Sequence, residues 1–262
     1  MGFFSFMKKL RKIFAQRPHI PAALDKNQLV TTILNRRSVR KFLEQDIKDD
    51  EMALILEAGR LAPSTVNMQT WSFGVFSEQT WKETFGHSIP FGAKRAVIVL
   101  GDITRMKRVT DIFPDVPLIE YTMSVINSSL AAMNMAIMAE ALGVGSVMLS
   151  DTGKTGFFST AHLREALRLP SGVYPLMTVV FGYARQENPP MPPKFDIEDI
   201  TFCETYKQTE VARIREWFSL MEAGYKAGHF FSSFKAKLRY YRDNLSRAEG
   251  ELRDSILGEK NR

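Results

Sequence analysis

The spacing of apolar residues predicts alternating helices and strands through the middle of the chain. Residues 119–142 form the longest helical pattern, and Met, Ala and Ile occupy nearly every face, so this helix should be buried on most sides. Short runs dense in β-branched and aromatic residues predict strands. The expected helices cover residues 25–35, 49–61, 119–142 and 160–169, and the expected strands cover 72–76, 95–100, 146–149 and 174–183. Residues 102–117 show no clear period and form a candidate mobile flap.

Two further amphipathic helices are predicted after Cys203. Apolar residues recur at three- and four-residue spacing over residues 211–225 and again over 231–252, and Gly224 and Gly228 interrupt the pattern. The second stripe has the heptad character of a coiled coil. Two arrangements fit it: a helix packed on its own body, or a two-stranded coil between subunits.

The first 17 residues predict a basic amphipathic helix. They carry five of the 35 basic residues and no acidic residue, so the remainder, with 30 basic against 29 acidic residues, is nearly neutral. The net charge therefore gives no evidence for a nucleic-acid surface, and no nucleic-acid partner is expected. The helix either packs on the body or on a partner subunit, or it rests on an anionic membrane surface. Its apolar positions are Phe3, Phe6, Met7, Leu10, Ile13 and Phe14.

Cysteine and histidine usage excludes several kinds of site. The single cysteine, Cys203, excludes an intramolecular disulfide and a multi-cysteine zinc or iron–sulfur site. The four histidines lack ligand spacing, so no metal site is expected. There is no signal-peptide pattern, and we expect no segment to be long and apolar enough to span a bilayer. These features favour a cytoplasmic protein, either free or held at the membrane surface through residues 1–17.

Residues 36–40, Arg-Arg-Ser-Val-Arg, form the densest cluster of candidate ligand-binding side chains. Arginine is always charged, and its planar fork of donors matches the oxygens of a phosphate group. By itself the cluster fits either an anion site or a solvated basic surface.

A second cluster, Ala-Pro-Ser-Thr-Val-Asn-Met-Gln-Thr-Trp, occupies residues 62–71, between a predicted helix and a predicted strand. It combines small residues with the side-chain amides of Asn67 and Gln69 and the indole of Trp71. These groups suit hydrogen bonding to a planar heterocycle and its sugar-like chain. A purely structural loop can carry the same residues, so both interpretations stay open for this cluster alone.

Two later segments complete a spaced pattern: Ala-Leu-Gly-Val-Gly-Ser at residues 141–146, and Gly182-Tyr183 at the end of the last predicted strand. Taken in order, Arg-Arg-Ser-x-Arg, Ala-Pro-Ser-x-x-Asn-x-Gln-x-Trp, Ala-Leu-Gly-x-Gly-Ser and Gly-Tyr resemble the FMN-dependent nitroreductase family. The resemblance covers residues 27–202, about two-thirds of the chain. Several spaced parts make it far more specific than a single glycine motif.

The resemblance implies an α+β fold: a nitroreductase-like sandwich with a mixed central sheet flanked by helices. The helical patterns outside it add a helical C-terminal extension and an N-terminal arm. We therefore expect three regions: the arm (1–20), an FMN-binding domain (21–203) and the extension (204–262). Proteins of this kind are usually intertwined homodimers with two FMN sites at the interface, and they use NAD(P)H as co-substrate.

The resemblance also implies roles for individual residues. Arg36, Ser38 and Lys194 would hold the flavin phosphate, and Arg37 would help to hold the phosphate or the ribityl chain. Arg40 would lie near the pyrimidine edge of the ring, where a fixed cation favours a developing negative charge. The remaining expected contacts are Pro63 and Ser64 against the ring, Asn67 and Gln69 toward the flavin of the other subunit, and Asp151, Thr152 and Gly153 near N5.

We therefore expect a flavoenzyme that transfers a hydride from NAD(P)H through FMN to an electron-poor acceptor such as a nitroaromatic, a quinone or an enone. Because the hydride chemistry belongs to the cofactor, no catalytic side chain is predicted. Two alternatives remain. One is reductive dehalogenation of a halogenated aromatic, a chemistry of the same superfamily. The other is a flavin-binding interaction protein anchored by its terminal helices.

Overall fold

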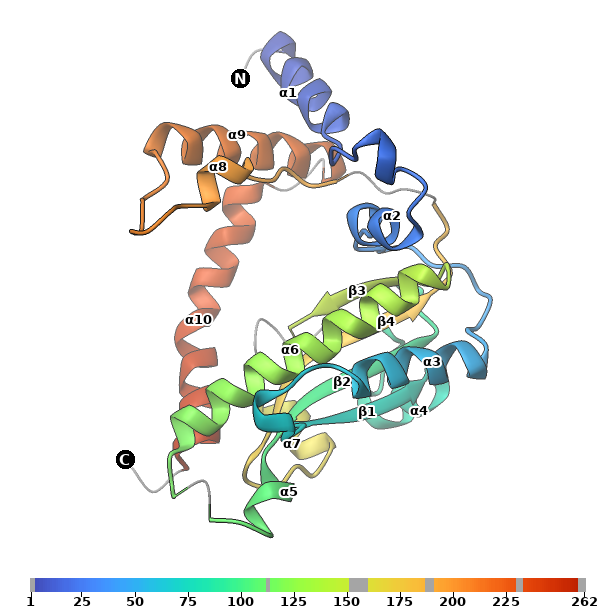
Figure 1. Ribbon diagram of the computed structural model, residues 1–262, viewed down its shortest axis with the longest axis vertical. Helices are drawn as coiled ribbons and strands as arrows, with labels where there is room; N and C mark the ends of the chain where they lie inside the picture. The colour runs from blue at the N-terminus through green and yellow to red at the C-terminus, as the bar shows by residue number, and fades with distance from the viewer. Residues whose placement is uncertain (1–2, 112–113, 151–159, 187–190, 230–232, 259–262) are drawn as a thin grey trace. The chain divides into compact units, whose positions relative to one another are not determined.

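The computed structural model describes residues 3–111, 114–150, 160–186, 191–229 and 233–258 (Figure 1). The chain forms two compact units. The sheet unit comprises residues 21–188 and 244–262, and the helical unit comprises residues 1–20 and 189–243. The boundary between them falls inside the last helix, α10 (Phe234–Leu257).

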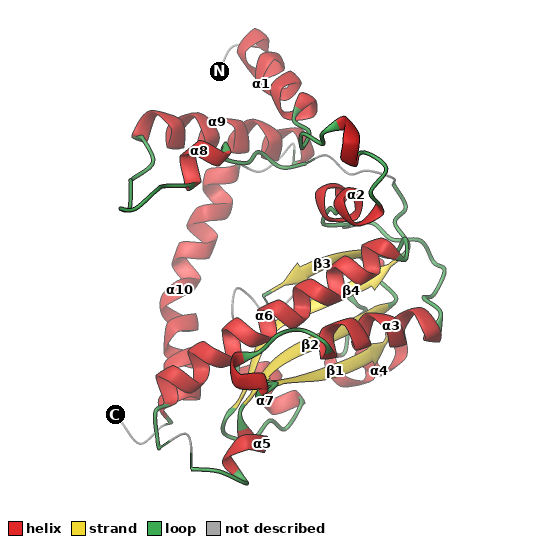
Figure 2. Ribbon diagram, viewed as in Figure 1, coloured by secondary structure: helices red, strands yellow, loops and turns green. Residues whose placement is uncertain are grey.

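The sheet unit is built on four strands in the order β1-β2-β4-β3, and each neighbouring pair is antiparallel. The parallel component of the predicted mixed sheet is one bridge between Ser38 and Ser146 at the β3 edge. All four predicted strands are present with ends shifted by at most two residues, and the predicted α+β class is confirmed (Figure 2). The strands are β1 (Trp71–Ser77), β2 (Arg95–Asp102), β3 (Gly145–Leu149) and β4 (Val173–Gly182).

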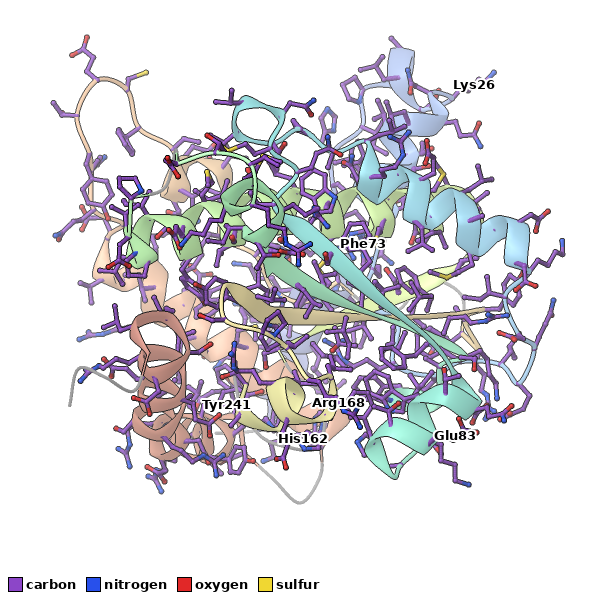
Figure 3. All side chains as sticks on the ribbon, turned by 90° about the horizontal axis from the view of Figure 1, so that it is seen from below. Lys26, Phe73, Glu83, His162, Arg168 and Tyr241 are labelled. Carbon is purple, nitrogen blue, oxygen red and sulfur yellow. The ribbon has the colours of Figure 1, made fainter. Side chains whose placement is uncertain are left out.

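Helices cover both faces of this sheet, because successive residues of a strand point to opposite sides. On one face α3 and α6 pack over Val97 and Val99 of β2, and on the other α4 and α7 pack over Ile98. Figure 3 shows Phe73 of β1 on one side of the sheet and His162 of α7 on the other. The helices of the unit are α2 (Gln28–Asn35), α3 (Asp49–Arg60), α4 (Glu78–Phe85), α5 (Thr104–Lys107), α6 (Pro117–Ala141) and α7 (Ala161–Ala166), with 3-10 turns η1 (Ala22–Leu24), η2 (Thr65–Asn67) and η3 (Pro90–Gly92).

The long helix α6 is buried along one side, which corrects the expectation of burial on most sides. Its inner side packs on the sheet and α3, because α6 lies across one face of the sheet. By length and a mean hydropathy of 1.2 it is also apolar enough to cross a bilayer, contrary to the sequence-based expectation, but 44% of that window is buried within the chain. It is therefore a core helix with an apolar outer stripe. The stripe consists of Ile119, Ile126, Leu130 and Met133, which are 63, 54, 42 and 43% exposed.

The C-terminal half of α10 packs against α7 in the sheet unit. The Glu251 carboxylate accepts hydrogen bonds from the backbone N–H groups of Thr160 (2.9 Å) and Ala161 (3.3 Å) at the start of α7. Arg164 donates to the hydroxyl of Ser255 over 3.1 Å. In this half, the predicted stripe is a helix packed on its own body.

The helical unit contains α1 (Phe3–Ala15), α8 (Ile197–Ile200), α9 (Val211–Gly228) and the first turns of α10. In it, α1 packs on α9. Ile13 is buried beside Gly224, and Lys12 forms an ion pair of 2.5 Å with Glu216. The predicted N-terminal arm is therefore a packed helix.

Candidate functional site

The arginine segment, residues 36–40, runs along the edge of β3. The N–H of Val39 donates to the carbonyl of Ser146 over 2.9 Å, next to the bridge between Ser38 and Ser146. Val39 is 6% exposed and packs in the core. Because neighbouring residues of an extended chain point to opposite sides, Ser38 and Arg40 face away from that core. The segment thus presents a hydroxyl and a guanidinium on one side.

Two glycines allow this segment to approach the sheet closely. A Cβ at Gly145 would lie 2.8 Å from Cγ2 of Val39, and a Cβ at Gly182 would lie 2.8 Å from the ring of Phe42. Contacts this short would force the neighbouring side chains to move. Glycine at 145 and 182 is therefore what lets the arginine segment lie against β3 and β4.

We expect Gly145→Ala to displace Val39 and lower the free energy of unfolding by about 1–3 kcal/mol, because overpacking forces side chains from their favoured positions. Urea denaturation measures the change. The matched control is Gly250→Ala in α10, where a new Cβ meets nothing within 4 Å and helix propensity favours alanine. Equal midpoints for the Gly145 variant and the wild type would contradict this packing.

Arg36 and Arg37 both follow α2 but have different surroundings. The guanidinium of Arg37 donates to the carbonyls of Leu34 and Arg36, each over 2.8 Å, and so closes the end of the helix. The Arg36 side chain is half-buried and makes no hydrogen bond or ion pair within the described ranges. Both arginines act on Glu140 of α6, whose pKa is raised by burial and partly lowered by their charges. Arg36 is therefore the member of the pair whose donors can serve an anion.

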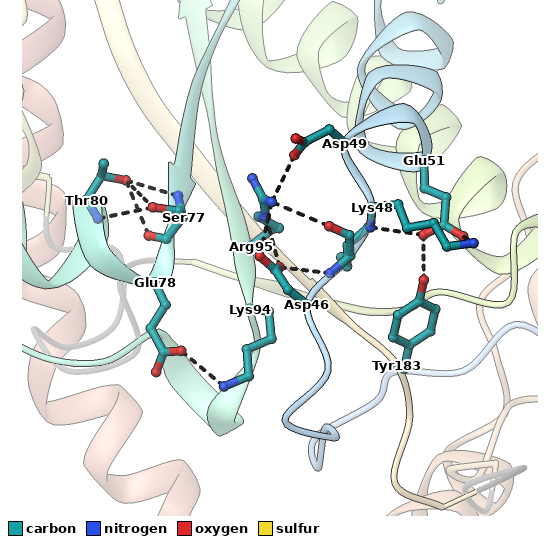
Figure 4. Close-up of polar contacts among 11 residues, drawn as sticks. Asp46, Lys48, Asp49, Glu51, Ser77, Glu78, Thr80, Lys94, Arg95 and Tyr183 are labelled. Carbon is teal, nitrogen blue, oxygen red and sulfur yellow. Dashed lines mark hydrogen bonds and ion pairs between the residues drawn. The ribbon is translucent and has the colours of Figure 1, made fainter.

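Charged side chains fasten the chain that follows the arginine segment (Figure 4). Arg95 of β2 donates to Asp46 over 3.0 Å and pairs with Asp49 at the same distance. Tyr183, after β4, donates to Glu51 over 2.5 Å; this bond, with a smaller effect of burial, raises the pKa of Tyr183 to about 12. These contacts hold the start of α3 against the sheet. They also hold the loop that connects the arginine segment to α3.

The second cluster forms a strained loop between α3 and β1. Val66, Asn67 and Gln69 have φ angles of 48°, 54° and 48°. This left-handed region favours glycine and is especially unfavourable for a β-branched residue such as Val66. Val66 is also 83% exposed, so its own packing does not hold it there. Strain of this kind persists only where the surroundings impose it, and it concentrates at functional sites.

Interior polar side chains impose the strain. The Oδ1 atom of Asn127, in α6, accepts a hydrogen bond from the N–H of Thr65 (3.2 Å), and its Nδ2 donates to the hydroxyl of Thr70 (2.9 Å). Asn127 and Thr70 are fully buried. Within the loop, the hydroxyl of Ser64 accepts from the N–H of Gln69 over 3.0 Å. The bonds from Asn127 fix both ends of the loop, and the bond to Ser64 closes the loop on itself.

The predicted flap adds a further support through Arg105 of α5. Its guanidinium donates to the carbonyls of Gln69 (2.9 Å) and Trp71 and to the hydroxyl of Ser72 (3.0 Å). Asp102 lies beside it: burial raises the pKa of this carboxyl, but hydrogen bonds, led by that from Ser72, and the charge of Arg105 lower it overall. At α5 the flap is therefore tied to the strained loop.

Asn67 and Gln69 line a groove of about 820 Å³ beside β1. The rings of Trp71 and Phe73 form part of its wall and stack with centroids 6.4 Å apart. Neither side-chain amide makes a hydrogen bond to the residues that the structure describes. Two amides beside an aromatic wall suit a planar polar ligand.

The two clusters lie at opposite edges of the sheet. The arginine segment borders β3, whereas the strained loop leads directly into β1. Neighbouring strands are about 4.8 Å apart, so three strand intervals, on the order of 14 Å, separate the two edges. The structure does not bring Arg36 and Asn67 of one chain together.

The other predicted site residues lie elsewhere. Pro63 is exposed at the start of the strained loop. Lys194 belongs to the helical unit, where the neighbouring Phe195 stacks on Trp217 with centroids 4.9 Å apart. Asp151, Thr152 and Gly153 fall outside the described residues.

The supporting residues Asn127, Thr70 and Arg105 were not predicted from the sequence. One signal was present: residues 127–129, Asn-Ser-Ser, interrupt an otherwise apolar helix. A buried polar side chain must find hydrogen-bond partners, so such an interruption indicates a contact to another element. It does not indicate which element.

A model of the nitroreductase family matches residues 33–183, more than half of the chain. The chain belongs to the nitroreductase family. The matched range contains both clusters and all four strands of the sheet. The family and the enzyme class predicted from the spaced motifs are thus confirmed.

Individual relatives agree with this assignment. An Archaeoglobus fulgidus protein whose name includes NAD(P)H nitroreductase is 31% identical over 161 residues, which are 59% of this chain and 84% of that protein. The NADPH-flavin oxidoreductase of Vibrio harveyi is 26% identical over 88% of this chain and 95% of its own length. Both names place the chain among NAD(P)H-dependent flavin and nitro oxidoreductases.

Solved structures agree on the fold. The structure of Bacillus megaterium NfrA2 superposes with a TM-score of 0.70 at 18% identity and covers 86% of this chain and 97% of its own. The Vibrio harveyi NADPH:FMN oxidoreductase in complex with NAD⁺ gives a TM-score of 0.65 at 22% identity, with 81% of this chain and 90% of its own covered. The chain thus has the nitroreductase-like α+β fold, and it ends in the helices α9 and α10.

Proposed function

We propose that the protein is an FMN-dependent oxidoreductase that uses NAD(P)H to reduce an electron-poor acceptor such as a nitroaromatic, a quinone or an enone. The observation that carries this proposal is the strained Ser64–Thr70 loop, which displays two amide side chains in a nitroreductase-family chain that also carries the arginine segment. The names of relatives support it, since they include a Bacillus subtilis FMN reductase (NADPH).

The donor set fits FMN. A phosphate of nearly two negative charges calls for guanidinium and hydroxyl donors, and the arginine segment offers Arg36, Ser38 and Arg40. The flavin ring and its ribityl chain call for amide donors and acceptors, and Asn67 and Gln69 offer both.

When bound, FMN would supply the redox chemistry, which is hydride transfer from NAD(P)H and two-electron reduction of the acceptor. The protein's own residues bind and orient. We assign Arg36 and Ser38 to the phosphate, and Arg40 to the ring edge where negative charge develops. Pro63 is assigned to the ring and Ser64 to holding the loop, through its bond to the N–H of Gln69. Arg37 is assigned to the helix end, where its two carbonyl contacts lie.

We further propose that the site is completed by a second copy of the chain. The two clusters lie at opposite edges of one sheet, so one flavin held by both is most simply shared between two chains. The outer stripe of α6 provides a surface for this contact, because Ile119, Ile126, Leu130 and Met133 lie on one side of the helix. In α2, which packs on α6, Leu29 and Ile33 extend the apolar surface. An apolar patch of this kind is typical of a subunit interface.

Ile126→Glu is expected to weaken dimer formation at least about 100-fold, because a two-fold interface would bury the unpaired charge twice. Analytical ultracentrifugation measures the dimer dissociation constant. The control is Val109→Glu, which places the same charge on a residue 79% exposed in the flap. A wild-type monomer, or equal effects of the two substitutions, would contradict the interface.

The proposed activity is tested by steady-state NAD(P)H oxidation with a simple quinone or a nitroaromatic, with and without added FMN. We expect turnover that depends on the acceptor and rises with FMN when the purified protein is under-loaded. A protein without bound flavin that gains no activity on addition of FMN would refute the proposal.

A further inference from the structure

The positive charge of the chain is concentrated in the helical unit. Residues 1–20 and 189–243 hold 14 of the 35 basic residues and 8 of the 29 acidic residues. The helical unit therefore carries the whole net charge of +6, and the sheet unit is balanced. The sequence located this excess only in the first 17 residues, whereas the fold joins those residues to α9 and to the basic first turns of α10.

One face of α1 is occupied by α9. Ile13 is 6% exposed beside Gly224, Lys12 pairs with Glu216, and Lys9 donates to the hydroxyl of Ser219. These contacts hold α1 against α9. They also determine which residues of α1 face away from α9.

The opposite face of α1 is apolar, aromatic and open to solvent. Phe3, Phe4, Met7 and Phe14 are 72, 89, 46 and 55% exposed. At 100° per residue, Phe3, Met7 and Phe14 fall within one 40° arc, and Phe4 lies 60° beyond it. The exposed side chains of Lys8 and Arg11 lie on the same half of the helix, beside Phe4.

We infer that this second face of α1 docks on a bilayer of anionic phospholipid. Aromatic side chains with bordering Lys or Arg residues are the composition of helices that lie in the membrane interface. A surface of anionic headgroups complements the charge of the unit and attracts each nearby Lys or Arg. A second copy of this chain is a poorer partner, because a two-fold contact would set the same basic residues against each other. This inference goes beyond the proposed redox function and does not depend on it.

Flotation of the full-length protein with lipid vesicles tests this docking. We expect recovery with vesicles of phosphatidylcholine containing 30% phosphatidylserine, about tenfold or more above recovery with pure phosphatidylcholine, and a loss of binding at high salt. Equal binding to both vesicle types, or binding to neither, would overturn the inference. Binding only to heparin, or self-association without vesicle binding, would overturn it in favour of another partner.

Two substitution sets locate the surface. Phe3→Ser, Phe4→Ser and Phe14→Ser together are expected to lower vesicle affinity about 100-fold or more. Lys8→Gln with Arg11→Gln is expected to lower it about 30-fold. The matched controls change the same residue classes elsewhere in the helical unit: Phe202→Ser with Tyr206→Ser, and Lys207→Gln with Arg215→Gln, all exposed.

The controls are expected to bind vesicles within about twofold of the wild type. Far-ultraviolet circular dichroism and flavin content report whether each variant remains folded, independently of lipid. Loss of affinity in the control sets equal to that in the α1 sets would overturn the assignment to this face. Loss of flavin activity with intact vesicle binding would refute only the proposed function.

Discussion

Replacing Arg36 with alanine is expected to leave the protein folded and to weaken FMN binding by about one to two orders of magnitude. A charge-assisted hydrogen bond to a phosphate contributes about 1.5–3 kcal/mol, and the side chain of Arg36 has no hydrogen bond or ion pair to lose among the described residues. Fluorescence titration of the flavin-free protein with FMN measures the dissociation constant.

Arg37→Ala is the matched control, since it removes the same side chain from the next position. Its guanidinium closes the end of α2, so we expect a loss of about 1 kcal/mol in the free energy of unfolding and a smaller effect on FMN affinity.

The Arg40→Ala variant should retain flavin, and the rate at which NAD(P)H reduces that flavin should change. Equal loss of FMN in the Arg36, Arg37 and Arg40 variants would contradict this division of roles.

Asn127→Ala is expected to lower the free energy of unfolding by about 2–4 kcal/mol and to weaken FMN binding as well. The substitution leaves the buried hydroxyl of Thr70 without its partner, which costs about 1–3 kcal/mol, and it also removes the hydrogen bond to the N–H of Thr65. Without that support, Val66, Asn67 and Gln69 can relax from their left-handed conformations. Urea denaturation and FMN titration measure the two effects separately.

The control for Asn127 is Asn134→Ala in the same helix. The amide of Asn134 donates to the carbonyl of Ala58 over 3.1 Å, and the residue is half-buried away from the strained loop. Asn134→Ala should lower the free energy of unfolding by about 1 kcal/mol and leave FMN affinity unchanged. If both variants lose stability and flavin equally, the loop is not the element through which Asn127 acts.

Local pattern in the sequence was sufficient to predict the strands. β1, β2 and β4 are rich in β-branched or aromatic residues, and β4 was placed within one residue of its ends. The helix α6 was found for the same reason, but its burial was misjudged. Composition reports how apolar a helix is, and it does not report whether the covering partner is its own sheet or another surface.

The two functional segments were predictable from the sequence. The separate roles of the residues within each segment were not. Arg36 and Arg37 are adjacent and chemically identical, and only the direction of each side chain at the end of α2 separates a helix cap from a candidate anion ligand. The strain at Val66 has no sequence signal, because β-branched residues ordinarily avoid positive φ. Its cause, Asn127, lies 62 residues beyond the loop residue that it binds, Thr65.

The chemistry of the site is tested most directly by the absorption spectrum of the purified full-length protein under anaerobic conditions, titrated with NADH and with NADPH. We predict a bound-flavin spectrum whose visible bands bleach on addition of one or both nucleotides and return when a quinone or a nitroaromatic is added. A protein that carries no flavin and takes up none from solution, or whose bound flavin neither nucleotide reduces, would contradict the proposed function.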